Sequence, residues 1–80
     1  MLASAAGAKV RVGMLGTGHS HFSGKYKAMM DSPDYEIVGV VENNAAARAA
    51  LQKDPRYAAV KWLEEDAMLK DSSILLAVVE

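Results

Sequence analysis

The chain has 80 residues, the length of one small domain or of a piece of a larger one. Apolar residues make up 51% of it and charged residues 24%, a balance typical of a folded globular protein rather than a disordered chain. The net charge of -1, without a basic stripe, argues against nucleic-acid binding, and the absence of cysteine excludes disulfides, thiolate zinc sites and a cysteine nucleophile.

Residues 1–8 are predicted to be a disordered leader. The segment is small and apolar, but it has neither the charged start nor the long apolar stretch of a signal peptide. No apolar run in the chain approaches about 18 residues, so no membrane span is expected. The lack of cysteine is compatible with the cytosol, and we expect a cytoplasmic protein.

A strand and a helix are predicted on either side of a glycine turn. The apolar segment Lys9 to Leu15 has the length of a buried strand, and the chain then breaks at Gly16-Thr17-Gly18. Helical spacing follows, and it forms one apolar face from Phe22, Tyr26, Met29 and Met30. Asp31-Ser32-Pro33 ends this helix, because the residue before a proline is pushed out of helical backbone geometry.

The segment Tyr35 to Val41 is predicted to be the second strand. It is rich in β-branched residues and almost continuously apolar, which is typical of parallel sheets covered on both faces. Glu42 closes this strand, and Asn43-Asn44 offers side chains that can cap a helix. An alanine-rich helix is then predicted over Ala45 to Lys53, and Pro55 stops it.

Three more elements are predicted before the chain ends. They are a short strand near Ala58 to Lys61, a helical turn or two from about Leu63 to Leu69, and, after the loop Asp71-Ser72-Ser73, a strand over Ile74 to Val79. The order β-α-β-α-β-α-β, without a hairpin signal, predicts an α/β fold with a parallel sheet and right-handed crossovers. We expect the four strands in the order 3-2-1-4, with the last one as an exposed apolar edge.

The glycine turn matches the start of a dinucleotide-binding motif. Gly16-Thr17-Gly18-His19-Ser20-His21 contains the first two glycines of G-x-G-x-x-G, after a predicted strand and before a predicted helix. The first glycine permits the tight turn, and the second lets a pyrophosphate approach bare backbone. The third position holds His21 instead of a small residue, so its imidazole must point away from the sheet or hold the helix further off. An ordinary strand–helix turn that needs positive φ is the alternative interpretation.

Glu42 strengthens the dinucleotide interpretation. It ends the second predicted strand, 24 residues after Gly18, where a carboxylate can accept hydrogen bonds from ribose hydroxyls and repel a 2′-phosphate. This favours NAD as the cofactor. Arg48 lies six residues further on and could meet a 2′-phosphate, so NADP stays open. A surface acid near a helix N-terminus is the alternative role for Glu42.

Two other kinds of site fit the sequence less well. A phosphate loop of the pattern G-x-x-x-x-G-K-[ST] does not fit, because Gly18 and Gly24 are six residues apart and Lys25 is followed by Tyr26. His19 and His21 lie two apart, but no obvious third ligand accompanies them, and we predict no metal site.

The chain resembles the N-terminal domain of the Gfo/Idh/MocA family of nicotinamide-dependent oxidoreductases. The resemblance extends over about Lys9 to Val79, and it rests on VRVGMLGTGHSH, on EIVGVVENNAAARAAL and on WLEEDAMLKDSSILLAVV. It implies a parallel, Rossmann-like sheet and NAD(P)-linked oxidation or reduction at a carbinol carbon, usually of sugars or polyols. It also implies that Glu42 binds the ribose and that the pyrophosphate turn consists of Gly16, Thr17, Gly18, His19 and Ser20.

The motifs that carry catalysis in this family are missing from these 80 residues. The Thr-Pro turn after the fourth strand, the Glu-Lys-Pro motif and the substrate-domain histidine have no counterpart here. We therefore expect residues 9–80 to be an incomplete dinucleotide-binding domain that is inactive alone and self-associates through its edge strand. Two alternatives are a stand-alone NAD(H)-binding sensor without catalysis and a nucleotide-free interaction protein.

Overall fold

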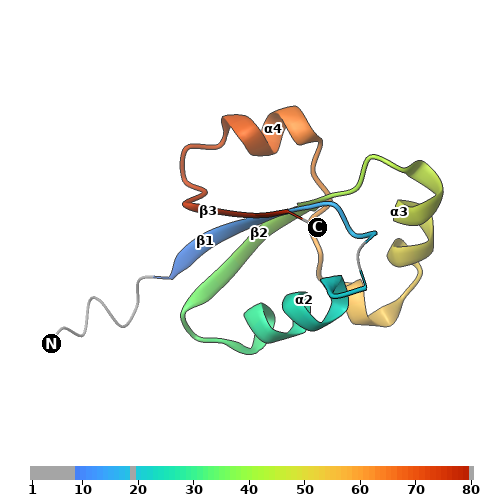
Figure 1. Cartoon of the computed structure of the whole chain (residues 1–80), viewed down its shortest axis with the longest axis horizontal. Coiled ribbons are helices and arrows are strands. Elements are labelled where there is room, and N and C mark those ends of the chain that lie inside the picture. The colour runs from blue at the N-terminus through green and yellow to red at the C-terminus, as the bar shows by residue number, and fades with distance from the viewer. Residues whose placement is uncertain (1–8, 19, 80) are drawn as a thin grey trace, which may run out of the picture.

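A computed structural model describes residues 9–18 and 20–79. The leader predicted over residues 1–8 lies outside the described residues. The elements, shown in Figure 1, are β1 (Val10–Leu15), α2 (Phe22–Asp31), β2 (Tyr35–Val41), α3 (Ala45–Gln52), a 3-10 turn η1 (Pro55–Tyr57), α4 (Glu65–Lys70) and β3 (Leu76–Val79). In the described part of the chain, no helix has the length and apolarity needed to cross a membrane.

The three strands form one parallel sheet in the order β2-β1-β3. Val10 is in register with Tyr35 at one end of the sheet, and Leu15 is in register with both Val41 and Val79 at the other. A β-bulge shifts the register of β1 against β2 after Val12. The α/β class and the parallel sheet predicted from the alternating pattern are thus confirmed.

The strand predicted over Ala58 to Lys61 is not formed. Pro55 begins η1, and Ala58 and Ala59 continue that turn, so only Lys61 to Leu63 run alongside β2. There the chain makes one isolated parallel bridge, between Val40 and Trp62, while the amide of Val40 donates to the Lys61 carbonyl at 2.9 Å. The sheet therefore has three strands, and the four-strand order 3-2-1-4 is not confirmed.

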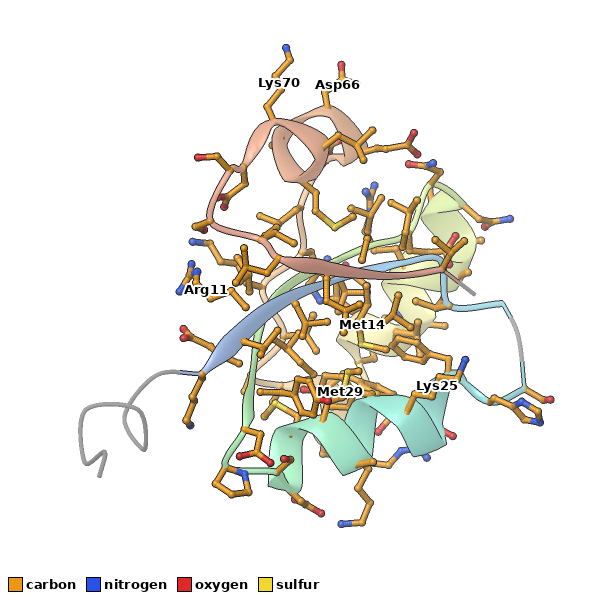
Figure 2. The ribbon with its side chains drawn as sticks, turned by 60° about the vertical axis from the view of Figure 1, so that its left-hand side comes forward. Arg11, Met14, Lys25, Met29, Asp66 and Lys70 are labelled. Carbon is orange, nitrogen blue, oxygen red and sulfur yellow. The ribbon has the colours of Figure 1, made fainter. Side chains whose placement is uncertain are left out.

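Helices cover both faces of the sheet, as Figure 1 shows with α2 on one side and α4 on the other. The α2 side holds the larger core, which consists of Val12, Met14, Phe22, Tyr26, Val40 and Tyr57. Figure 2 shows Met14 and Met29 between the sheet and α2, and Asp66 and Lys70 on the outer side of α4. The predicted apolar face of α2 is thus correct except at Met30, which is 48% exposed.

Two strand glycines let the α4 side approach the sheet closely. A Cβ atom at Gly39 would lie 2.6 Å from Cγ of Leu63 and 2.9 Å from the carbonyl oxygen of Lys61. A Cβ atom at Gly13 would lie 2.6 Å from Sδ of Met68. Real Cβ atoms do not make such contacts, so Gly39 leaves no room for a side chain beneath the Lys61 carbonyl, whereas a side chain at Gly13 would require Met68 to move.

Most predicted element ends agree with the structure. Asn44 caps α3 by accepting a hydrogen bond from the amide of Ala47 at 3.0 Å, as expected. The strand predicted from Ile74 begins later, at Leu76, because the amide of Ile74 donates to the Asp71 carbonyl in the preceding turn. The helical segment predicted from Leu63 becomes α4, which begins at Glu65.

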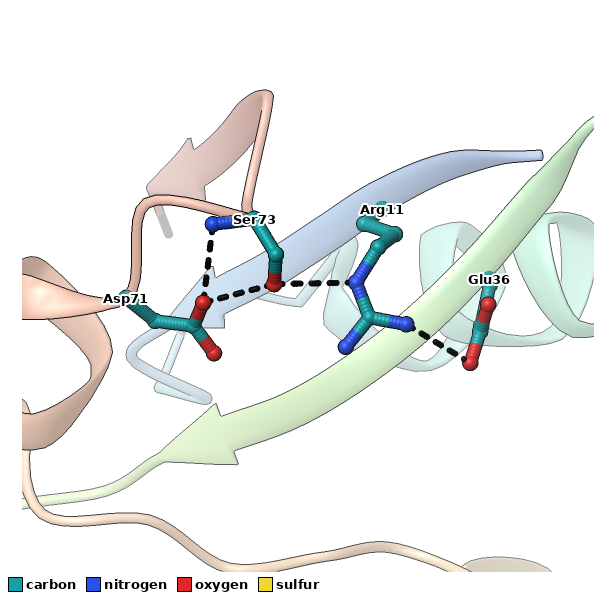
Figure 3. Close-up of polar contacts among 4 residues, drawn as sticks. All are labelled: Arg11, Glu36, Asp71 and Ser73. Atoms are coloured by element: carbon teal, nitrogen blue, oxygen red, sulfur yellow. Dashed lines mark hydrogen bonds and ion pairs between the residues drawn. The ribbon is translucent and has the colours of Figure 1, made fainter. Parts of the chain in front are cut away.

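A polar network ties the loop before β3 to the other two strands, as Figure 3 shows. Nε of Arg11 on β1 donates to Oγ of Ser73 at 3.0 Å, and its guanidinium also donates to Glu36 on β2 at 3.2 Å. Ser73 in turn donates to Asp71 through both its amide, at 2.9 Å, and its hydroxyl, at 2.6 Å. Because these groups are exposed, the network fixes the position of the loop more than it adds to stability.

Candidate functional site

The carboxyl ends of the three strands meet at one edge of the sheet. Leu15, Val41 and Val79 lie in register there, so the glycine turn after β1 and Glu42 after β2 are neighbours. Strand β1 lies between β2 and β3, and the chain therefore leaves β1 to one side and later returns on its other side. In open α/β sheets, this point of divergence is where ligands bind.

The turn after β1 has the geometry expected of the first glycine. Gly16 has φ of 92°, the only positive φ among the described residues, and its amide donates to the Val41 carbonyl at 2.8 Å. A Cβ atom at Gly18 would have no atom within 4 Å, so this position faces open space. Ser20 is exposed. His19, also predicted to belong to the pyrophosphate turn, lies outside the described residues.

Glu42 is attached to the glycine turn. Its side chain is buried, with 9% of its surface exposed. The Oε1 atom accepts hydrogen bonds from the amide of Thr17 at 3.0 Å and from the Thr17 hydroxyl. The Oε2 atom accepts from the amide of Asn44 at 2.9 Å. The structure thus brings together two of the predicted site residues, Thr17 and Glu42.

These contacts keep the Glu42 carboxylate charged. The Thr17 hydroxyl is the main cause that lowers the pKa of Glu42 below its usual value, followed by the amide of Asn44. Burial acts in the opposite direction, and the nearby Arg48 guanidinium lowers the pKa further. The site therefore presents a fixed negative charge beside the glycine turn.

Thr17 does not have the contact expected of it. As a member of the pyrophosphate turn, it would offer its amide to a phosphate, but that amide donates to Glu42. Gly18 is the described residue of the turn that leaves bare backbone facing open space. Phosphate contact at this turn thus depends on the residues that follow Thr17.

Arg48 lies near Glu42 but forms its ion pair elsewhere. Its NH1 atom is 3.9 Å from Oε1 of Glu64, and 32% of the Arg48 side chain is exposed. Asn43, just before α3, donates to Glu65 on α4 at 2.7 Å, so two polar contacts link the segment around α3 to the start of α4. Arg48 is thus a cation within reach of the site, held by a long and largely exposed pair.

The departure at His21 does not prevent α2 from packing on the sheet. His21 is exposed and comes just before the helix, while Phe22 is buried. The Phe22 ring lies 5.9 Å from that of Tyr26 and 5.6 Å from that of Tyr57, measured between centroids. Of the two outcomes predicted for the imidazole, the exposure of His21 agrees with the one in which it points away from the sheet.

A separate groove of about 530 Å³ lies between α2 and η1. It is lined by Ser23, Gly24, Tyr26, Lys27, Met30, Asp31, Arg56 and Tyr57. Neither Glu42 nor any described residue of the glycine turn lines it. Within residues 9–18 and 20–79, no group of three or more His, Asp or Glu side chains is arranged to hold a metal ion.

The Thr17–Glu42 contact was not predicted from the sequence, although a signal for it exists. In a parallel sheet that pairs Leu15 with Val41, the residues that directly follow both strands come close together. A hydroxyl residue in one turn and an acid in the other can then form a hydrogen bond.

Comparison with protein-family models, with curated proteins and with solved structures finds no match for this chain.

Proposed function

We propose that the chain binds NAD at the carboxyl edge of its sheet, as the dinucleotide-binding portion of a Gfo/Idh/MocA-like oxidoreductase. The observation that carries this proposal is the charged Glu42 carboxylate, fixed beside a turn whose Gly16 has positive φ. Both lie where the chain diverges to either side of β1. A Rossmann-like arrangement of glycine turn, helix and acid is consistent with these contacts.

Each part of the site has a separate role in this proposal. Gly18, without a side chain, lets the pyrophosphate approach the backbone. No described side chain caps the start of α2 and no acid lies in its first turn, so its amide groups can bind an anion. Glu42 accepts a hydrogen bond from the adenosine ribose, and its negative charge disfavours a 2′-phosphate, which makes NAD the preferred cofactor over NADP.

The reaction follows from the resemblance alone. The nicotinamide of a bound NAD would supply hydride chemistry, and the substrate class would be a sugar or polyol. The four-strand order 3-2-1-4 also belongs to this proposal, with the segment around Trp62 in the outer position beside β2. Binding without catalysis, as in an NAD(H) sensor, uses the same site and the same residues.

The proposal is tested by titration calorimetry with NAD and two variants. Gly18→Val places a side chain where the pyrophosphate approaches, and it should weaken NAD binding at least about ten-fold, since close backbone approach is lost. Ala28→Val is the control, because Ala28 is also exposed but lies further along α2, beyond the first turn whose amide groups are proposed to bind the anion. Equal affinity of both variants and the parent chain for NAD would contradict the proposed site.

A further inference from the structure

Thr17 supplies two of the three hydrogen bonds that hold the Glu42 carboxylate in the described structure. Its amide and its hydroxyl both donate to Oε1, whereas Oε2 receives only the amide of Asn44. The two amides are backbone groups that any residue would provide. The Thr17 hydroxyl is therefore the one side-chain donor in this set, and it joins the end of β1 to the end of β2 directly.

The remaining acceptor capacity of Glu42 is limited. A carboxylate has about four lone-pair directions. Oε1 uses both of its directions on Thr17, and Oε2 uses one on Asn44. Among the residues that the structure describes, no donor takes the fourth direction, on Oε2. A single hydroxyl donor fits this vacancy, whereas a phosphate monoester, which is mostly a dianion at neutral pH, would be repelled by the carboxylate.

We propose that Thr17 is a positioning residue, which holds Glu42 so that Oε2 accepts one ribose hydroxyl and the carboxylate excludes a 2′-phosphate. This inference rests on the proposed function and assigns the ligand class more narrowly, as a dinucleotide whose adenosine ribose carries free hydroxyls. It also gives Thr17 a role different from that of a pyrophosphate ligand.

The physical reason is preorganisation. A glutamate side chain free to rotate would lose conformational entropy when it binds the ribose, and it could turn away from a 2′-phosphate. Held by Thr17, the carboxylate has already lost that freedom and stays where the 2′-phosphate would lie. The Thr17 hydroxyl should thus increase affinity for NAD and also increase discrimination against NADP.

Two substitutions separate the hydroxyl from the shape of the side chain. Thr17→Val keeps the branched shape and the backbone amide but removes the donor, while Thr17→Ser keeps the donor. Without the hydroxyl, the Glu42 side chain must be ordered when NAD binds, and this cost should weaken NAD binding up to roughly ten-fold in Thr17→Val. Binding of NADP should weaken less or strengthen, and Thr17→Ser should bind both dinucleotides like the parent chain.

Calorimetric titration of the three chains with NAD and with NADP is the first measurement. The expected result is a preference for NAD that falls in Thr17→Val and is restored in Thr17→Ser. If Thr17→Val weakens both dinucleotides by the same factor, or if Thr17→Ser behaves like Thr17→Val, the hydroxyl has only a structural role and the inference is overturned.

The second measurement needs no ligand. Carboxyl NMR titration of Glu42 in each folded chain should show its pKa rise toward the usual value in Thr17→Val and stay low in Thr17→Ser. An unchanged pKa in Thr17→Val would overturn the positioning role. Failure of the parent chain to bind either dinucleotide would instead overturn the proposed function, and the NMR titration distinguishes the two failures.

Discussion

Glu42 and Thr17 show how a contact between residues 25 apart in sequence can build a site. Neither residue alone identifies a function, because an acid at a strand end and a threonine in a turn are common. Their hydrogen bonds give the carboxylate a fixed place and a lowered pKa. The resulting charge at the end of β2 is the feature from which affinity for NAD and rejection of a 2′-phosphate are expected.

Stability should depend on pH through Glu42. Its pKa is lower in the folded chain than the ordinary value of 4.5, so between these two values the unfolded chain binds more protons. The free energy of unfolding should therefore rise with pH through this window. The contribution of Glu42 to it should be fully present above pH 4.5 and be lost as pH falls through the folded pKa.

Urea unfolding at a series of pH values checks this prediction with Glu42→Gln. The variant keeps the size of the side chain but cannot ionise, so its stability should rise less steeply in the same window. At neutral pH it should also be less stable by about 1–3 kcal/mol, because hydrogen bonds to a charged acceptor are weakened. Parallel curves for the parent chain and the variant would show that Glu42 is not held in the folded state.

At the scale of elements, the first half of the chain could be predicted closely from its sequence. Strand β2 has the predicted bounds, and α2 ends at Asp31, before Pro33, as expected. These elements are encoded locally, by apolar periodicity, by proline and by the capping side chain of Asn44. Local signals of this kind do not depend on how the elements pack, which is why they sufficed.

The structure of the second half of the chain depends on tertiary contacts, which local sequence signals do not reveal. The strand predicted over Ala58 to Lys61 does not form because η1 and the turn that follows it occupy the start of that segment. The Asp54 side chain caps η1 by accepting a hydrogen bond from the amide of Arg56 at 2.9 Å. Likewise, the close packing at Gly39 depends on where Leu63 lies, and the Thr17–Glu42 contact depends on strand register. Spacing along the sequence does not reveal such tertiary contacts.

Strand β3 is the element from which we predict self-association with a second copy of the chain. In the described residues it pairs only with β1, and the segment Ile74–Val79 contains no charge and no proline to protect its free edge. Leu75 is 75% exposed and Val79 is 69% exposed. Burying this edge against a second copy would remove apolar surface and satisfy the open backbone groups.

A double substitution, Leu75→Lys with Ala77→Lys, should shift the chain toward monomer. Both positions are exposed, so the charges should repel a second edge strand with little effect on folding. Met30→Lys with Leu69→Lys is the matched control, since it also replaces two exposed apolar residues with lysine, neither of them on β3. Sedimentation velocity measures the outcome, and a monomeric parent chain would contradict the prediction.

For the molecule as a whole, the arrangement of strands determines which edge can bind a ligand. Three parallel strands direct their carboxyl ends to the same side, and the chain diverges there on either side of β1. The groove between α2 and η1 is the competing site in the described structure, and it shares no described residue with the glycine turn or with Glu42. The residues whose NMR signals change when a ligand is added therefore show which of the two sites it occupies.

Backbone NMR spectra recorded while NAD is added test the central claim most directly. The account predicts that the largest shifts fall on Gly16, Thr17, Gly18 and Ser20 and on the segment Glu42 to Asn44, with smaller shifts for NADP at the same concentration. Residues of the groove, such as Lys27 and Arg56, should change little. Shifts confined to the groove, or no shifts at millimolar NAD, would contradict dinucleotide binding at the carboxyl edge of the sheet.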